Sequence, residues 1–212
     1  MKQESRYILG IDEAGRGCVL GPLVVAGVLF EDRADIFDIL HSYNIRDSKL
    51  LTVEKRAALC RVVRRLKHKS LALRIAPSRI DEESLNVLEI EHSVRIIGKL
   101  RPHTVYLDVP ATGAGIANYC NAIKSRCGIA EIEILGGNNY DGINLVVAAA
   151  SIVAKEVREA EVRKLHKSYG DFGSGYAHDP RTRAWLTSWK QSQKKWPAMV
   201  RTKWETVARM SV

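Results

Sequence analysis

The sequence lacks the long apolar runs that membrane-spanning and secreted chains need. No apolar run approaches ~18 residues, and the opening residues, MKQESRY, contain no hydrophobic signal core. We therefore expect a cytoplasmic protein that does not enter a membrane. At 212 residues and 46% hydrophobic composition, the chain is long enough for one substantial core and a small helical appendage.

The sequence also lacks cysteine and histidine patterns that bind metals or form disulfides. Its four cysteines include no CxxC pair, and its six histidines form no ligand cluster by spacing. If the chain between them is helical, Cys120 and Cys127 lie roughly 10 Å apart, which is too far for a disulfide. We expect reduced thiols, and we interpret Cys18 as a small buried side chain.

Acidic residues are too few to balance the basic ones, so the formal net charge is +9 and the pI is about 9.5. This excess favours an anionic partner, and composition leaves nucleic acid, acidic lipid and acidic protein open. Residues 46–79 hold eleven Lys or Arg against two Asp or Glu, and residues 155–212 hold thirteen against six, whereas residues 1–45 and 80–154 are net acidic. Basic flanks around an acidic centre suit a phosphate-rich substrate, although one basic block alone is more often a solvated helix surface.

Strand and helix patterns alternate along the chain. The predicted strands are Tyr7 to Asp12, Leu23 to Phe30, Ser70 to Ala76, Val105 to Asp108 and Glu131 to Leu135. The predicted helices follow a cap at Thr52, run from Pro77 to about Leu100, span Gly115 to Ser125, and run from Val146 to about Lys167. This alternation predicts an α/β fold with a mixed five-stranded sheet flanked by helices.

Beyond Gly170 the sequence changes to a loop rich in Gly, Tyr, Asp and Pro, followed by a basic tail. Asp179 and Pro180 are expected to begin a helix in this tail. Its tryptophans are expected to anchor it to the core: Trp185, Trp189, Trp196 and Trp204. We therefore predict a main domain of residues 1–168 and a C-terminal helical extension of residues 169–212 packed on it.

Four acidic residues lie at strand ends or in a loop where they could form one site. Asp12 and Glu13 are adjacent at the end of an apolar strand, where like charges raise each other's pKa unless a cation lies between them. Asp108 ends another strand, and Asp141 lies in the loop before the long helix. Taken singly, either is more often a turn residue than a ligand. Together the four offer only hard oxygen ligands, which favours Mg²⁺ or Mn²⁺ over zinc and suits two-ion phosphoryl displacement.

A glycine-rich loop, Gly15-Arg16-Gly17, follows the paired carboxylates. A dinucleotide-binding loop should open a helix, whereas the residues after this loop have a strand pattern, so we reject that interpretation. Glycines at both positions would let backbone amides approach a ligand, and a simple tight turn is the alternative.

Several motifs occur in one order along the chain: IDEAGRG near the start, DSK at residues 47–49, YLD at 106–108, AAASIVAK at 148–155, GSGY at 173–176 and VRTKWETV near the end. Together they closely resemble type 2 ribonuclease H, also called ribonuclease HII, in its archaeal and eukaryotic-like branch. The resemblance covers roughly residues 6–207, and the ordered set is highly specific. GGNNYD departs from many relatives, which have a histidine-bearing segment before the aspartate, but no matched carboxylate is lost.

The resemblance implies a ribonuclease H-like fold and an endonuclease acting on RNA–DNA hybrids and on duplex DNA with embedded ribonucleotides, as in ribonucleotide excision repair. Such an enzyme cuts the RNA strand, nicks 5′ to the embedded ribonucleotide, and leaves 5′-phosphate and 3′-hydroxyl ends. It also implies two Mg²⁺ or Mn²⁺ ions held by the family's acidic quartet, which falls on Asp12, Glu13, Asp108 and Asp141.

For substrate binding, the resemblance implies a ribose-reading loop at Gly15, Arg16 and Gly17. It also implies that Tyr176 packs against the deoxyribose after the ribonucleotide, and we expect Lys49 and the basic blocks to grip phosphates. Backbone groups aimed at a 2′-hydroxyl discriminate because a deoxy substrate leaves them unpaired. In this interpretation residues 1–168 are catalytic and residues 169–212 contact substrate.

Two other functions remain open from the sequence. Another nuclease or strand-transfer protein on the same fold would use similar carboxylates, because fold does not fix substrate. A basic nucleic-acid-binding module would use them structurally and hydrolyse nothing. We expect a monomer, and a sliding-clamp partner is conceivable although the C-terminus shows no clear clamp-binding peptide.

Overall fold

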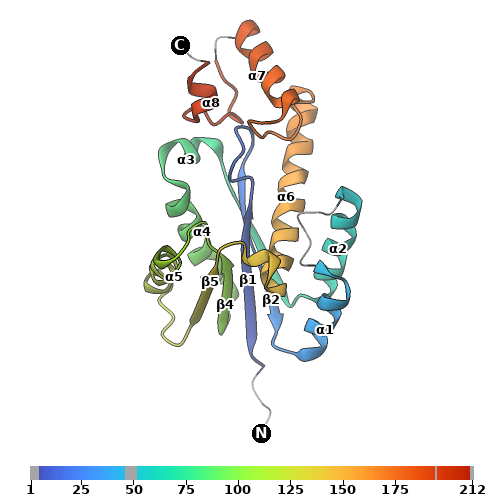
Figure 1. The fold of residues 1–212 in the computed structure, drawn as a ribbon, viewed down its shortest axis with the longest axis vertical. Coiled ribbons are helices and arrows are strands. Elements are labelled where there is room, and N and C mark those ends of the chain that lie inside the picture. The colour runs from blue at the N-terminus through green and yellow to red at the C-terminus, as the bar shows by residue number, and fades with distance from the viewer. Residues whose placement is uncertain (1–4, 46–51, 194, 211–212) are drawn as a thin grey trace.

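A five-stranded sheet forms the centre of the molecule in the computed structural model, which describes residues 5–45, 52–193 and 195–210 (Figure 1). The strand order is β3-β2-β1-β4-β5. The bounds are β1 Tyr7–Ala14, β2 Leu23–Glu31, β3 Lys69–Ile75, β4 Thr104–Asp108 and β5 Glu133–Gly137. β1 pairs antiparallel with β2 and parallel with β4, so the predicted mixed five-stranded sheet is confirmed.

The last strand differs from its predicted range, because β5 begins at Glu133 and continues through Gly136 and Gly137. These two glycines pair in parallel with the last residues of β4, Leu107 and Asp108. Glycine is usually depleted in strands, so the sequence pattern ended this strand too early. A side chain on Gly136 would meet Val109 and Cys120 at less than 3 Å, so the sheet needs glycine here.

Helices cover both faces of the sheet, as Figure 1 shows. One face packs against α4 and α5, and its core includes alternate residues of the central strands, such as Leu9, Ile11, Val105 and Leu107. The other face packs against α1, α2 and α6. The helices span α1 Ala34–Ser42, α2 Val53–Leu66, α3 Pro77–Glu82, α4 Leu85–Leu100, α5 Ala114–Cys127 and α6 Leu145–Tyr169.

One helical prediction needs correction, and one helix was missed. The pattern from Pro77 to Leu100 is two helices, because the chain is extended at Glu83 and the hydroxyl of Ser84 accepts a hydrogen bond from the amide of Val87 to begin α4. Such a cap satisfies a backbone donor that a helix start leaves unpaired. Helix α1 was not predicted. The expected cap at Thr52 is confirmed, since its side chain accepts from the amide of Lys55.

The first half of α6 lies directly against β1. A methyl group on Gly10 would lie 1.9 Å from the carbonyl oxygen of Val146, so only glycine allows this approach. The small residues Ala148, Ala149 and Ala150 are fully buried in the same layer. This close packing places the start of α6 beside the strand that carries Asp12 and Glu13.

The C-terminal segment, with α7 Pro180–Ser192 and α8 Glu205–Ala208, lies at the far end of α6 from the sheet (Figure 1). Asp179 caps α7 as expected, accepting from the amide of Arg181. The segment has its own apolar cluster, which also takes in Val19 and Leu20 from the β1–β2 connection. Trp185, Trp196 and Trp204 pack against that cluster and Trp189 stacks on Trp185, which fits the expected anchoring role.

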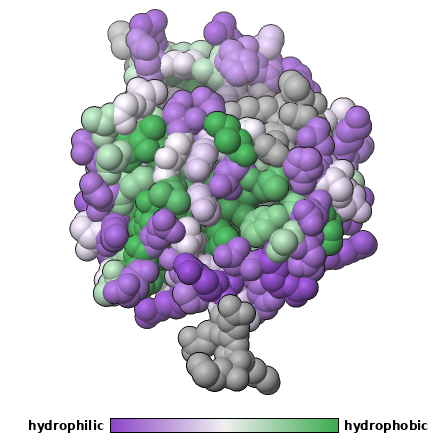
Figure 2. Space-filling view, turned by 60° about the horizontal axis from the view of Figure 1, so that its bottom comes forward, coloured by the Kyte–Doolittle hydropathy of each residue, from purple (hydrophilic) through white to green (hydrophobic). Residues whose placement is uncertain are grey.

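The surface at the N-terminal end of the sheet is partly apolar. Figure 2 shows hydrophobic side chains gathered in the middle of this face and hydrophilic ones around them.

No helix in the described part of the chain is both long and apolar enough to cross a membrane. The boundary between a main domain of residues 1–168 and a C-terminal extension of residues 169–212 stays a prediction.

Candidate active site

Three of the predicted carboxylates meet at one edge of the sheet. Asp12 and Glu13 lie near the end of β1, and Asp108 is the last residue of β4. Because these strands are parallel neighbours, with Ile11 opposite Leu107, their ends coincide. One carboxylate oxygen from each of the three residues lies within 4.8 Å of the others. This spacing brings three negative charges together around a volume that a cation can occupy.

The surroundings of the cluster oppose the ionisation of its carboxylates together. Burial, and next the charge of Glu13, raise the pKa of Asp12 well above its usual range. Burial, and next the charges of Glu89 and Asp108, raise the pKa of Glu13 to about 8. A divalent cation between the oxygens would reverse these shifts, because an opposite charge favours the ionised carboxylate. The donor set of oxygens alone fits Mg²⁺ or Mn²⁺.

Asp141 is buried beside this cluster, on the short turn Tyr140–Gly142 between β5 and α6. The turn is tied to the cluster, since the amide of Tyr140 donates to Oδ1 of Asp108 at 2.6 Å. Nζ of Lys155, on α6, lies 4.0 Å from Oδ2 of Asp141. Among the described residues, the group that converges within 4.8 Å contains the other three carboxylates and not Asp141.

The Gly15-Arg16-Gly17 loop and Tyr176 are neighbours in the structure although about 160 residues separate them. Cys18 pairs with Tyr176 in an isolated antiparallel bridge, and a methyl group on Gly17 would lie 3.7 Å from the tyrosine ring. The guanidinium of Arg158 lies 5.2 Å from the centroid of that ring. Burial, and next the neighbouring Cys18, raise the pKa of Tyr176 to about 12.

Gly15 has a φ of +92°, a conformation that favours glycine. A methyl group there would also lie 2.6 Å from Nε of Arg158 and 2.9 Å from the carbonyl oxygen of Pro22. The first glycine of the loop is therefore required both by backbone conformation and by close packing.

The side chain of Arg16 is held by α4. Its Nη1 forms an ion pair with Oε2 of Glu89, and its Nη2 donates to Oδ1 of Asn86 at 2.5 Å. Glu89 is buried, and its charge is among the causes that raise the pKa of Glu13. The sequence analysis missed Glu89. A charged residue within the apolar face of a predicted helix was the available signal.

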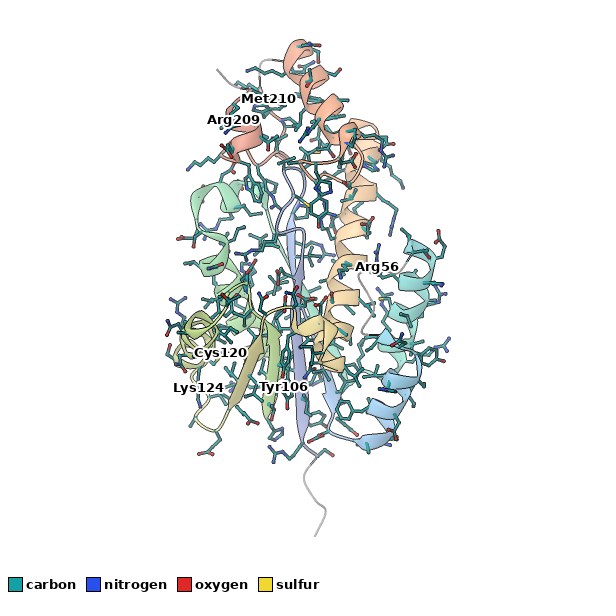
Figure 3. The ribbon with its side chains drawn as sticks, in the orientation of Figure 1. Arg56, Tyr106, Cys120, Lys124, Arg209 and Met210 are labelled. Atoms are coloured by element: carbon teal, nitrogen blue, oxygen red, sulfur yellow. The ribbon has the colours of Figure 1, made fainter. Side chains whose placement is uncertain are left out.

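A cavity of about 200 Å³ opens between α2, α6 and Tyr176. Arg56, labelled in Figure 3, reaches across from α2 toward α6, where its Nε donates to Oε1 of Glu156 at 3.1 Å. Three of the lining residues are basic, and the lining comprises Ala14, Arg56, Lys155, Arg158, Glu159 and Tyr176. Lys49, which was predicted to grip phosphates, lies outside the described residues.

Comparison with known proteins decides the family. Residues 9–207 match the model of the family described as Ribonuclease HII. The chain belongs to the ribonuclease HII family. It is therefore a metal-dependent endoribonuclease of the family that cleaves RNA in RNA–DNA hybrids, which disfavours the non-enzymatic alternative.

Relatives of this ribonuclease HII chain match it over nearly their whole length. Ribonuclease HII of Methanothermobacter thermautotrophicus is 41% identical, over 94% of this chain and 97% of the relative. The crystal structure of ribonuclease H2 from Pyrococcus horikoshii superimposes with a TM-score of 0.87 at 33% identity, covering 97% of each chain. A structure of the PCNA:RNase HII complex from Archaeoglobus fulgidus gives 0.84 at 37% identity, covering 93% and 95%. The predicted family and ribonuclease H-like fold are confirmed.

Proposed function

We propose that this ribonuclease HII chain cuts the RNA strand of RNA–DNA hybrids and nicks duplex DNA on the 5′ side of an embedded ribonucleotide, using two divalent ions. The observation that carries the proposal is the convergence of Asp12, Glu13 and Asp108 within 4.8 Å at the ends of two parallel strands. Water attacks the phosphorus, the bond from phosphorus to the 3′ oxygen breaks, and the products carry a 5′-phosphate and a 3′-hydroxyl.

The carboxylates hold the cations in this scheme. Asp12, Glu13 and Asp108 form the central ligand set, and Asp141 extends it from the adjacent turn. When bound, two divalent ions supply positive charge next to the attacking and leaving oxygens of the phosphoryl group. Lys155, near Asp141, limits the negative charge on that side of the cluster.

The selection of ribonucleotides is assigned to the loop beside the cluster. Backbone groups of Gly15, Arg16 and Gly17 read the ribose 2′-hydroxyl, and Tyr176 packs on the following deoxyribose. Their proximity in the fold supports this assignment, because a single sugar-phosphate step can contact both. A deoxy substrate would leave the loop's polar groups unpaired, which is a strong source of discrimination.

The basic residues around the site attract the substrate backbone. Arg56, Arg158 and Lys155 line the cavity next to Tyr176, and the net charge of +9 acts over a longer range. The extension of residues 169–212 contributes Tyr176 and several basic side chains, so we propose that it contacts substrate. The Archaeoglobus fulgidus relative was solved with PCNA. A sliding-clamp partner of this chain stays a prediction.

One assay tests the function. Purified protein is incubated with matched duplexes that contain no ribonucleotide, one, or four consecutive ribonucleotides, with Mg²⁺, Mn²⁺ or a chelator, and the cut positions are mapped. We expect cleavage only with metal, and a cut 5′ to the single ribonucleotide. Equal cleavage of the all-DNA duplex would instead support a nuclease of another specificity on the same fold.

A further inference from the structure

Arg201, in the C-terminal segment, is a fully buried arginine that binds the proposed ribose-reading loop. Its Nη2 donates to the carbonyl oxygen of Gly15 at 2.7 Å, and its Nη1 donates to that of Arg16 at 3.0 Å. Its Nε and Nη2 both donate to the carbonyl oxygen of Gly21 at 3.2 Å. All three acceptors belong to the connection between β1 and β2, about 180 residues earlier in the chain.

The charge of Arg201 is balanced by these carbonyl dipoles. Among the residues that the structure describes, no carboxylate lies within ion-pair distance of its guanidinium, and the ring of Trp204 lies 5.2 Å away. Burial lowers the pKa of Arg201 to about 10, so it remains protonated at neutral pH. A buried cation is costly unless it is fully hydrogen-bonded, and here the loop carbonyls provide the bonds.

The backbone around Arg201 fixes the outer half of the same loop. The amide of Arg201 donates to the carbonyl of Val19 at 2.9 Å, and the amide of Gly21 donates to the carbonyl of Met199 at 2.8 Å. Leu20 and Val200 form an isolated bridge. The main chain of residues 199–201 therefore holds residues 19–21, and the Arg201 side chain extends this grip to residues 15 and 16.

This grip has a directional consequence, because a trans peptide is planar and its C=O and N–H point to opposite sides. The C=O of Gly15 shares a peptide plane with the N–H of Arg16, and the C=O of Arg16 shares one with the N–H of Gly17. The described chain contains no cis peptide. By binding both carbonyls, Arg201 turns the two N–H groups to the opposite side of the loop, away from its own buried side chain.

We propose that Arg201 is a positioning residue that aims the amide N–H groups of Arg16 and Gly17 at the substrate ribose, a role that rests on the proposed function of the loop. Without the guanidinium, the carbonyls of Arg16 and Gly21 lose the side-chain donors that bind them, and the carbonyl of Gly15 keeps only the amide of Cys18, at 3.3 Å. The loop then gains by rotating these carbonyls toward water. The N–H groups rotate with them and no longer face the 2′-hydroxyl.

The test compares Arg201→Lys with Arg209→Lys. Lysine keeps the positive charge but lacks the planar fork that reaches several carbonyls at once. Arg209, labelled in Figure 3, lies on the same segment and is exposed, and its only described ion pair is with Glu205 of the preceding turn. Both changes are made in an Asp12→Asn background, so that the substrate stays intact while affinities are measured for a single-ribonucleotide duplex and the matched all-DNA duplex.

We expect Arg201→Lys to lower the affinity ratio between the two duplexes by roughly 10-fold or more, the scale on which a polar site rejects a misplaced partner. The affinity of Arg201→Lys for the all-DNA duplex should stay unchanged, and so should the affinity ratio of Arg209→Lys. A merely structural defect would instead weaken the binding of both duplexes alike. Amide hydrogen exchange should accelerate in peptides covering residues 15–21 only in Arg201→Lys.

An unchanged ratio together with unchanged exchange at residues 15–21 in Arg201→Lys overturns the proposal. If the parent protein shows no preference for the ribonucleotide, the proposed reading function fails, and the exchange measurement still decides whether Arg201 positions the loop. Arg201→Gln, which buries no charge, is the second variant if lysine prevents folding, and both are measured below their unfolding midpoints.

Discussion

The pH dependence of stability in the metal-free protein should reveal the electrostatic strain of the acidic cluster. The substitution Glu13→Gln removes one of the carboxyl groups that cause this strain. The usual pKa of Glu13, 4.5, applies in the unfolded chain, and folding raises the pKa to about 8. A carboxyl group with a raised folded-state pKa stabilises the fold below its unfolded pKa, and this contribution is lost as the pH rises toward the folded value. The free energy of unfolding should therefore fall between about pH 4.5 and pH 8.

The size of the effect follows from the same values. One pKa unit corresponds to about 1.36 kcal/mol, so full loss would reach about 5 kcal/mol, and relaxation and water entry reduce it. We expect wild type to lose at least about 2 kcal/mol more than Glu13→Gln between pH 5 and pH 8, or roughly 4–8 °C in Tm for a chain of this size.

The assay is thermal unfolding in chelator at both pH values. Glu205→Gln, at an exposed carboxylate, serves as the control and should behave as wild type. Adding Mg²⁺ should stabilise wild type more at pH 8 than at pH 5, since a bound cation favours the ionised carboxylate. Parallel losses of stability in wild type and Glu13→Gln would refute the reasoning.

Three further predictions concern the site and the packing that supports it. Asp12→Asn should abolish Mg²⁺-dependent cleavage, which means a loss in cleavage rate of roughly 100-fold or more. Duplex binding in a gel-shift assay should be retained. Tyr176→Ala should reduce kcat/KM on a single-ribonucleotide duplex more than it reduces nonspecific DNA affinity. Gly10→Ala should lower the free energy of unfolding by about 2 kcal/mol or more, because its methyl group would overlap the carbonyl of Val146, whereas Gly98→Ala, with open space around it, should cost nothing.

Each of these has a contrary outcome. Robust cleavage by Asp12→Asn would remove that residue from the ligand set, and normal cleavage by Tyr176→Ala would refute its role at the sugar. Equal stabilities of the two glycine variants would show that β1 and α6 tolerate a wider separation than the structure has.

The sequence predicted the sheet well because its strands have clear apolar patterns and end in distinctive residues. It failed where local preference opposed the tertiary structure, as at Gly136 and Gly137, which are poor strand formers held by pairing with β4. The break between α3 and α4 was missed because the acidic run that precedes Ser84 has good helix propensity on its own.

The site divides in the same way. Asp12 and Glu13 form a pair through adjacency, and their meeting with Asp108 was predicted on the condition that their strands are parallel neighbours. Neither the contact of Arg16 with Glu89 nor that of Arg201 with the loop carbonyls leaves a periodic signal. Each joins segments through packing of separate elements.

The sequence by itself determined the chemical groups: which carboxylates are available, that their oxygens suit a hard divalent cation, and that glycines free the backbone of the loop. Only the tertiary structure decided which groups meet, because contacts across about 70 to 180 residues depend on strand order and helix packing rather than on local preference. Burial was decided at the same level. Removal from water is what raises the pKa of the clustered acids and obliges Arg201 to bond the loop.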